Sequence, residues 1–109
     1  MADATLKPIF SSLEEDPEAG VAIDAFVVGL GERVDMLQDA EVEGDLRQLA
    51  ALAGGVITEA DKAGFAPLSD VAKRLESACF DGDAVMARAC LCELTDAAQC
   101  VRLGHKGAV

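Results

Sequence analysis

The sequence predicts an all-α protein, an antiparallel four-helix bundle with a short additional N-terminal helix. No segment alternates apolar and polar residues with period two for long, whereas several carry apolar residues at spacings of three and four. Short breaks rich in glycine and aspartate separate these segments. Amphipathic helices joined by such short connections pack most simply as an antiparallel bundle.

The first expected helix lies within residues 1–15, and the second spans about 17–41. The first would close one end of the bundle with an apolar face of Leu6, Ile9, Phe10 and Leu13. It ends near EEDPEAG, where Asp16 would cap the second helix and Pro17 would occupy its first turn. The second helix carries an apolar stripe of Ile23, Phe26, Val27, Leu30, Val34 and Leu37.

Three further helices follow the break VEGD at residues 42–45. Asp45 would cap a helix that Gly64 stops, with an inward seam of Leu46, Leu49, Ala53, Val56, Ala60 and Ala63. A helix from about Pro67 to Phe80 would bury Leu68, Val71, Leu75 and Ala78. After FDGD, Asp83 would cap the last helix, with Ala87, Cys90, Leu94, Ala97 and Val101 inward. The tail, residues 104–109, is expected to fray.

Length and charge indicate one domain, residues 1–109, and exclude several partners. Twenty acidic and nine basic residues give a net charge of −11, which repels a phosphate backbone and an anionic membrane surface alike. We therefore expect binding to neither nucleic acid nor membrane. The N-terminus lacks the features of a signal peptide, and no apolar run approaches the roughly 20 residues that span a bilayer. The expected location is cytoplasmic.

The four cysteines, Cys79, Cys90, Cys92 and Cys100, indicate neither a disulfide framework nor a metal site. No export signal places the chain in an oxidising compartment. Cys90 and Cys92 are two apart on a predicted helix, so their side chains point about 200° apart, and the chain contains one histidine. We expect Cys79 and Cys90 to be buried, Cys92 to be exposed and oxidisable, and no metal or cofactor to be bound.

Two adjacent glycines, Gly54 and Gly55, lie in the middle of the helix predicted after Asp45, where each costs roughly 1 kcal/mol relative to alanine. The centre of the apolar stripe lies about 130° from Gly54, so this glycine should face outward. A partner-binding patch of small residues is expected there, formed by Arg47, Ala50, Ala51, Gly54, Gly55, Ile57, Thr58 and Asp61. Alternatively, the glycines are tolerated without a role, or they contact another helix of the same bundle.

The order of several residues between position 23 and about 104 is that of a known family. The matching residues, in FVVGLGERVDMLQDAEVEGDLRQLAALAGG and GFAPLSDVAKRLESACFDGD, are Phe26, Gly44, Asp45, Leu49, Gly64, Leu68, Leu75, Glu76, Gly82 and Asp83. In this order and spacing the chain resembles the histidine-containing phosphotransfer domains. These helical bundles shuttle phosphate between sensor kinases and the receiver domains of response regulators. The resemblance implies the bundle fold and docking on such partners.

The reactive residues of that family are missing here. Counting without gaps from Leu75 and Gly64 places the family's phosphorylated histidine at Gly54, its lysine at Ile57 and its following glycine at Thr58. Glycine offers no nucleophile, so we expect no catalytic residue and no enzymatic activity.

Three other residues carry side chains that could accept a phosphoryl group. His105 is an ordinary residue of the tail. A phosphoester on Thr58 would hand on its phosphate poorly, and no base lies nearby to activate the hydroxyl. Asp61 is most simply a solvated charge. None of the three is expected to replace the missing imidazole.

The resemblance therefore implies a noncatalytic pseudo-phosphotransfer module that docks on a response-regulator receiver or a histidine kinase and modulates phosphorelay. Gly54 should lie level with about Gly31, and Val28, Glu32 and Gln38 would be second-helix contributors to the docking face. Since receivers often present acidic residues, docking would depend on apolar contact and on local bases such as Arg47, with a kinase's helical dimerisation region as the alternative partner.

Two alternatives from other classes stay open. One is a helical interaction or oligomerisation protein unrelated to phosphorelay, present as a monomer or a weak homodimer. The other is an active phosphocarrier that uses an unorthodox residue.

Overall fold

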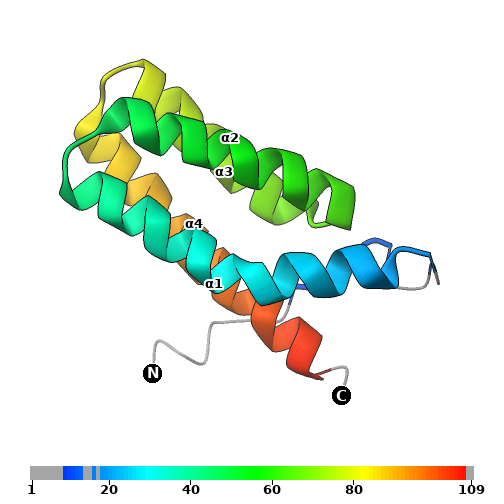
Figure 1. The fold of residues 1–109 in the computed structure, drawn as a ribbon. Coiled ribbons are helices and arrows are strands. Elements are labelled where there is room, and N and C mark those ends of the chain that lie inside the picture. The colour runs from blue at the N-terminus through cyan, green and yellow to red at the C-terminus, as the bar shows by residue number, and fades with distance from the viewer. Residues whose placement is uncertain (1–8, 14–15, 17, 108–109) are drawn as a thin grey trace.

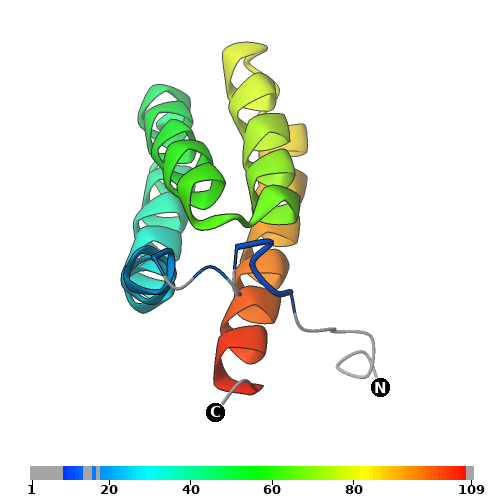
Figure 2. The same cartoon turned by 90° about the vertical axis from the view of Figure 1, so that its right-hand side faces the viewer.

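The structure is a computed structural model that describes residues 9–13, 16 and 18–107, with side chains up to residue 104. The described helices are α1 (Gly20–Val42), α2 (Leu46–Ala63), α3 (Ala66–Phe80) and α4 (Ala84–Gly107). Consecutive helices run antiparallel, and the N-terminal part of α1 and the C-terminal part of α4 extend beyond α2 and α3 (Figure 1). Seen from one end, α1 and α2 form one side and α3 and α4 the other (Figure 2). The predicted all-α arrangement of four antiparallel helices is confirmed.

The core is formed by the stripes that the spacing predicted. Leu30, Leu37 and Leu49 are fully buried, and the rings of Phe26 and Phe65 stack with their centroids 5.5 Å apart. Of the inward positions predicted for the four long helices, only Leu46 and Ala97 are half-buried instead of buried. Because burying a large aliphatic side chain contributes about 1.5–3 kcal/mol, these aligned stripes are the main source of stability.

The start of α1 differs from the prediction. The helix begins at Gly20, and the residue before it, Ala19, makes no side-chain capping bond. The Asp16 carboxylate instead accepts from the N–H of Glu18 at 2.9 Å. Asp16 therefore closes a local turn ahead of the helix, as aspartate readily does two residues before a backbone N–H. Pro17 lies outside the described residues.

The breaks between helices follow the predicted chemistry. Asp45 accepts from the N–H of Gln48 at 3.0 Å, and Asp83 accepts from the N–H of Met86 at the same distance. Gly64, with φ +82°, ends α2 in the left-handed conformation that glycine adopts without strain. These contacts satisfy orphan backbone groups at the helix ends.

The N-terminal helix is the main correction to the predicted fold. Residues 9–13 are not helical, while 1–8 and 14–15 lie outside the described residues. The N–H of Ile9 donates to the carbonyl of Cys100 at 2.9 Å, and that of Ser12 donates to the carbonyl of Gly64 at 2.8 Å. The hydroxyl of Ser11 donates to the carbonyl of Ala63. These backbone and side-chain bonds go to other helices, so the segment covers the ends of α2 and α4 as a non-helical strap.

At the other terminus, α4 is helical through Gly107. Residues 104–107 are thus helical where we expected a frayed tail, and 108–109 lie outside the described residues. Gly104 is buried against the strap, because a Cβ there would meet the carbonyl oxygen of Ile9. Packing against the strap stabilises the last turns of α4, which extend beyond the end that the sequence pattern predicted. Within the described residues, no helix is long and apolar enough to cross a membrane.

The Asp45 cap gives a first testable prediction. Asp45→Ala should lower the free energy of unfolding by about 1 kcal/mol, since the Gln48 N–H loses its partner. Asp81→Ala is the control, because Asp81 lies at the C-terminal end of α3 and its carboxylate accepts no hydrogen bond from a described residue. Urea denaturation of both variants measures the difference. Equal stability of the two variants would contradict the capping role.

Candidate docking surface on helix α2

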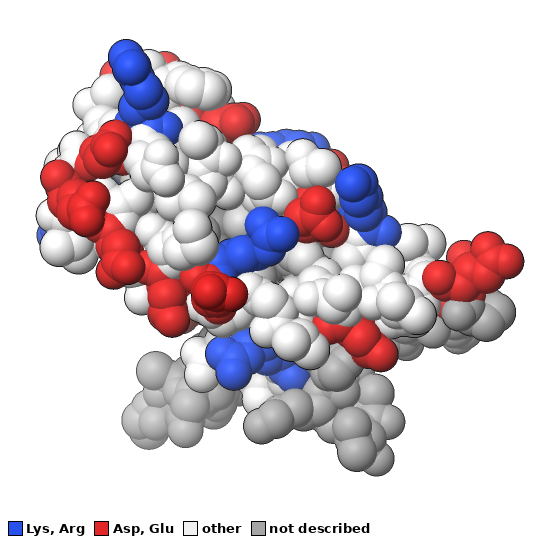
Figure 3. All heavy atoms as spheres, viewed as in Figure 1, with Lys and Arg blue, Asp and Glu red and all other residues white. Residues whose placement is uncertain are grey.

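The outward side of α2 carries the small residues that the periodicity placed there. Arg47, Ala51 and Thr58 are exposed, and Gly54 and Gly55 between them are half-exposed. We name these five residues the α2 ridge. On the face formed by α1 and α2, acidic side chains follow α1 while much of the remaining surface is uncharged (Figure 3). Asp61, also predicted for the patch, is exposed one turn further along the helix.

Two residues predicted for the patch are less exposed than expected. Ala50 is only 4% exposed, and Ile57 is half-buried against the core. A Cβ on Gly54 would point toward Glu76 of α3, and Ala50 and Ile57 are turned further in that direction at 100° per residue. Packing of α3 therefore covers Ala50 and part of Ile57, so the isoleucine at the edge of the ridge is only half-exposed.

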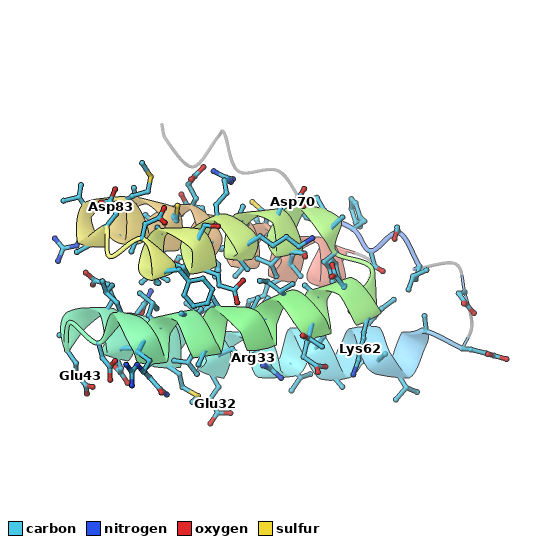
Figure 4. The ribbon with its side chains drawn as sticks, turned by 90° about the horizontal axis from the view of Figure 1, so that it is seen from above. Glu32, Arg33, Glu43, Lys62, Asp70 and Asp83 are labelled. Atoms are coloured by element: carbon cyan, nitrogen blue, oxygen red, sulfur yellow. The ribbon has the colours of Figure 1, made fainter. Side chains whose placement is uncertain are left out.

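Charged side chains from the neighbouring helices flank both glycines. A Cβ on Gly54 would lie 3.2 Å from a carboxylate oxygen of Glu76 on α3. A Cβ on Gly55 would lie 3.6 Å from a guanidinium nitrogen of Arg33 on α1, and Figure 4 shows Arg33 at the junction of α1 and α2. Neither charge forms an ion pair with a described residue. The two glycines therefore expose backbone between an anion of α3 and a cation of α1, neither of which is ion-paired among the described residues.

The contribution of α1 differs from the expected one. Gln38 donates to the hydroxyl of Thr95 on α4 at 3.4 Å, so it lies away from α2. Gly31 also faces α4, since a Cβ there would lie 3.7 Å from a guanidinium nitrogen of Arg102. Glu32 borders a hollow between α1 and α2 that includes Leu52. Val28 is 81% exposed.

Sequence reasoning missed Arg33 and gave Glu76 no place beside the ridge. Arg33 and Gly55 are each eleven residues from Gly44, the glycine of the turn between their helices. Pairing residues at equal distances on either side of that turn would have placed Arg33 beside Gly55. Glu76 carried no comparable local signal, because its position follows from how α3 packs across α2.

The ridge offers no group suited to nucleophilic chemistry. The hydroxyl of Thr58 donates to the carbonyl of Gly54 at 3.2 Å, which is a bond within the helix. A Cβ on Gly54 would lie 3.2 Å from the Glu76 carboxylate, which would repel a phosphoryl group at this place. The side chain of His105 lies outside the described ones.

The cysteines are placed as expected, with Cys79 and Cys90 buried and Cys92 exposed. Burial raises the pKa of the Cys79 thiol, and the neighbouring Cys90 and Glu76 add to the effect. Burial also raises the pKa of Cys90, with Glu93 adding to it. Both thiols therefore stay protonated and unreactive. In the part of the chain that the structure describes, no three metal-ligating side chains lie close enough to hold an ion.

Comparisons with models of known protein families, with curated proteins and with solved structures gave no match.

The glycines themselves give a second prediction. Gly55→Ala should raise the free energy of unfolding by about 1 kcal/mol, because alanine favours the helix and the new Cβ meets only ordinary contact at 3.6 Å. Gly54→Ala should stabilise less, since the Glu76 carboxylate must shift. Thermal unfolding of both variants measures this. A loss of stability in Gly55→Ala would mean that the fold itself requires that glycine.

Proposed function

We propose that the chain is a noncatalytic docking module of two-component signalling, a pseudo-phosphotransfer domain. It binds a response-regulator receiver or a histidine kinase through the α2 ridge, and it modulates phosphorelay by occupying a surface that an active phosphotransfer domain would use. The observation that carries this proposal is the bare backbone of Gly54 at the middle of the ridge, where the family resemblance expects the phosphorylated histidine.

The ridge supports docking because the backbone conformation at Gly54 and Gly55 does not require glycine. Each glycine costs the helix roughly 1 kcal/mol relative to alanine. Gly54 and Gly55 have ordinary helical dihedrals, unlike the positive-φ glycines Gly44, Gly64 and Gly82. A partner that approaches the backbone closely provides a reason for the missing side chains.

The charges beside the ridge favour a binding role over phosphotransfer. The Glu76 carboxylate next to Gly54 opposes a phosphoryl group at that place. Arg33 beside Gly55 and the exposed Arg47 offer local positive charge to a partner with acidic groups. Docking would thus combine close backbone contact with local charge pairing, despite the net charge of −11.

A competition experiment tests this function. Phosphoryl transfer from a labelled receiver to an active phosphotransfer domain is followed with increasing amounts of this chain. We expect the transfer to slow in proportion to the occupied receiver, with no label on the chain. Label on the chain would indicate an active phosphocarrier. If transfer is unchanged with every receiver and kinase of the source organism, the docking proposal fails. The hypothesis of a helical interaction or oligomerisation protein would then stand, in which the ridge pairs with a second copy.

A further inference from the structure

A second exposed surface lies at the end of the bundle where the α1–α2 and α3–α4 turns meet (Figure 1). We name it the turn end and define it by Val42, Glu43, Phe80, Asp81, Val85 and Met86. It is separate from the α2 ridge, and its argument does not depend on the proposed function.

The turn end exposes large apolar side chains. Val42 is 81% exposed, Phe80 74% and Val85 82%. They come from the last residue of α1, the last residue of α3 and the first turn of α4. Met86, 51% exposed, adjoins them. Large apolar side chains exposed together at one end of a domain are typical of an interaction surface.

The two turns that carry these residues lie at the same end of the bundle (Figure 4). Arg88 of α4 forms a salt bridge with Glu41 of α1 at 3.0 Å, which ties the start of α4 to the end of α1. Glu43 and Asp83 lie at the same end of the bundle in the view from above (Figure 4). A single partner segment can therefore contact both turns.

The two turns share one design, in which an exposed apolar residue precedes an acid, a glycine and an aspartate. The glycines, Gly44 and Gly82, have φ of +73° and +72°. The second acid of each turn has a structural task, since Asp45 and Asp83 cap α2 and α4. The first acids, Glu43 and Asp81, follow the C-terminal ends of α1 and α3.

Local stability does not explain Glu43 and Asp81. A carboxylate at a helix C-terminus faces the negative end of the helix dipole, and neither α1 nor α3 has a base in its last turn. Neither acid forms an ion pair with a described residue. Acidic side chains also line the C-terminal half of α1 toward this end (Figure 3). A positively charged partner would offset the unfavourable interaction of the Glu43 and Asp81 carboxylates with the C-terminal ends of α1 and α3.

We propose that the turn end binds a basic amphipathic protein segment. Its apolar side chains would cover Phe80, Val42 and Val85, and its lysines or arginines would pair with Glu43 and Asp81. A second copy of this chain fits the surface less well, because end-to-end contact would bring two acidic turn ends together. Anionic membranes are repelled by the same charges.

The test uses isotope-labelled protein and a synthetic helical peptide with a leucine stripe and lysine elsewhere. Adding it should shift the backbone amides of the six turn-end residues. Phe80→Ser should weaken binding about tenfold or more, and Asp81→Lys should weaken it and flatten its salt dependence. Val28→Ser is the matched control, because Val28 is equally exposed on α1 beside Glu32. Circular dichroism confirms that each variant is folded.

A peptide with the same leucine stripe and glutamate in place of lysine should not bind. The proposal is overturned if that peptide binds equally well, or if Val28→Ser weakens binding as much as Phe80→Ser. It is also overturned if the free protein doubles its mass at rising concentration and Phe80→Ser abolishes this, because the occupant would then be a second copy.

Discussion

Gly54→Arg should leave the bundle folded and weaken docking on its partner about tenfold or more, which corresponds to at least about 1.4 kcal/mol. The new Cβ would meet only the end of the flexible Glu76 side chain, at 3.2 Å. The arginine can pair with that carboxylate, and it replaces a poor helix former by a good one. The same side chain would fill the bare part of the ridge and hold a partner away from the backbone.

Calorimetric titration of the partner measures the affinity, and thermal unfolding checks the fold. Ala89→Arg is the matched control, because Ala89 is an exposed alanine on α4, away from the ridge. The control should bind as the unaltered chain does. Unchanged affinity of Gly54→Arg would remove the ridge from the account, and equal loss in both variants would point to net charge instead of position.

Gly64→Ala should be the most destabilising single substitution among the glycines with positive φ. Alanine in the left-handed conformation costs about 1–2 kcal/mol. At Gly64 the new Cβ would also lie 2.6 Å from the hydroxyl of Ser11 and 2.9 Å from the side chains of Ser12 and Leu13. Displacing these side chains adds about 1–3 kcal/mol, so we expect a total loss near 3 kcal/mol.

Gly82→Ala isolates the backbone contribution. Its φ is +72°, close to that of Gly64, but no atom lies within 4 Å of the added Cβ. Urea denaturation should therefore show a loss of about 1–2 kcal/mol for this variant, and the difference between the two reports how firmly the strap holds. Equal losses would show that residues 11–13 do not pack on the end of α2.

The helices were predictable because their signals are local. Asp45 marks the start of α2 and Gly64 marks its end, each through hydrogen bonds within four residues. The spacing of the apolar residues identified the buried side of each helix. The N-terminal helix was not predictable in this way. Ile9, Phe10 and Leu13 fit a helical face, yet the N–H of Ile9 bonds to Cys100, far along the chain. Whether the N–H of Ile9 bonds within a local helix or to the carbonyl of Cys100 depends on the tertiary structure.

The candidate site was predictable in its centre but not at its edges. Periodicity alone predicted that Gly54 faces outward, because the centre of the apolar stripe on α2 is well defined. Ala50 and Ile57 lie at the border of that stripe, and the packing of α3 decided their burial. Glu76 and Arg33 reach the glycines across helix boundaries, so pattern along a single helix could not place them.

The most direct test of the docking proposal is a titration of isotope-labelled protein with receiver domains of the same source organism, with and without a phosphoryl mimic. We expect amide shifts to cluster at Ala51, Gly54, Gly55 and Thr58, with smaller changes at Arg33. If no receiver and no kinase dimerisation region moves these amides, the α2 ridge is not a docking surface for two-component proteins.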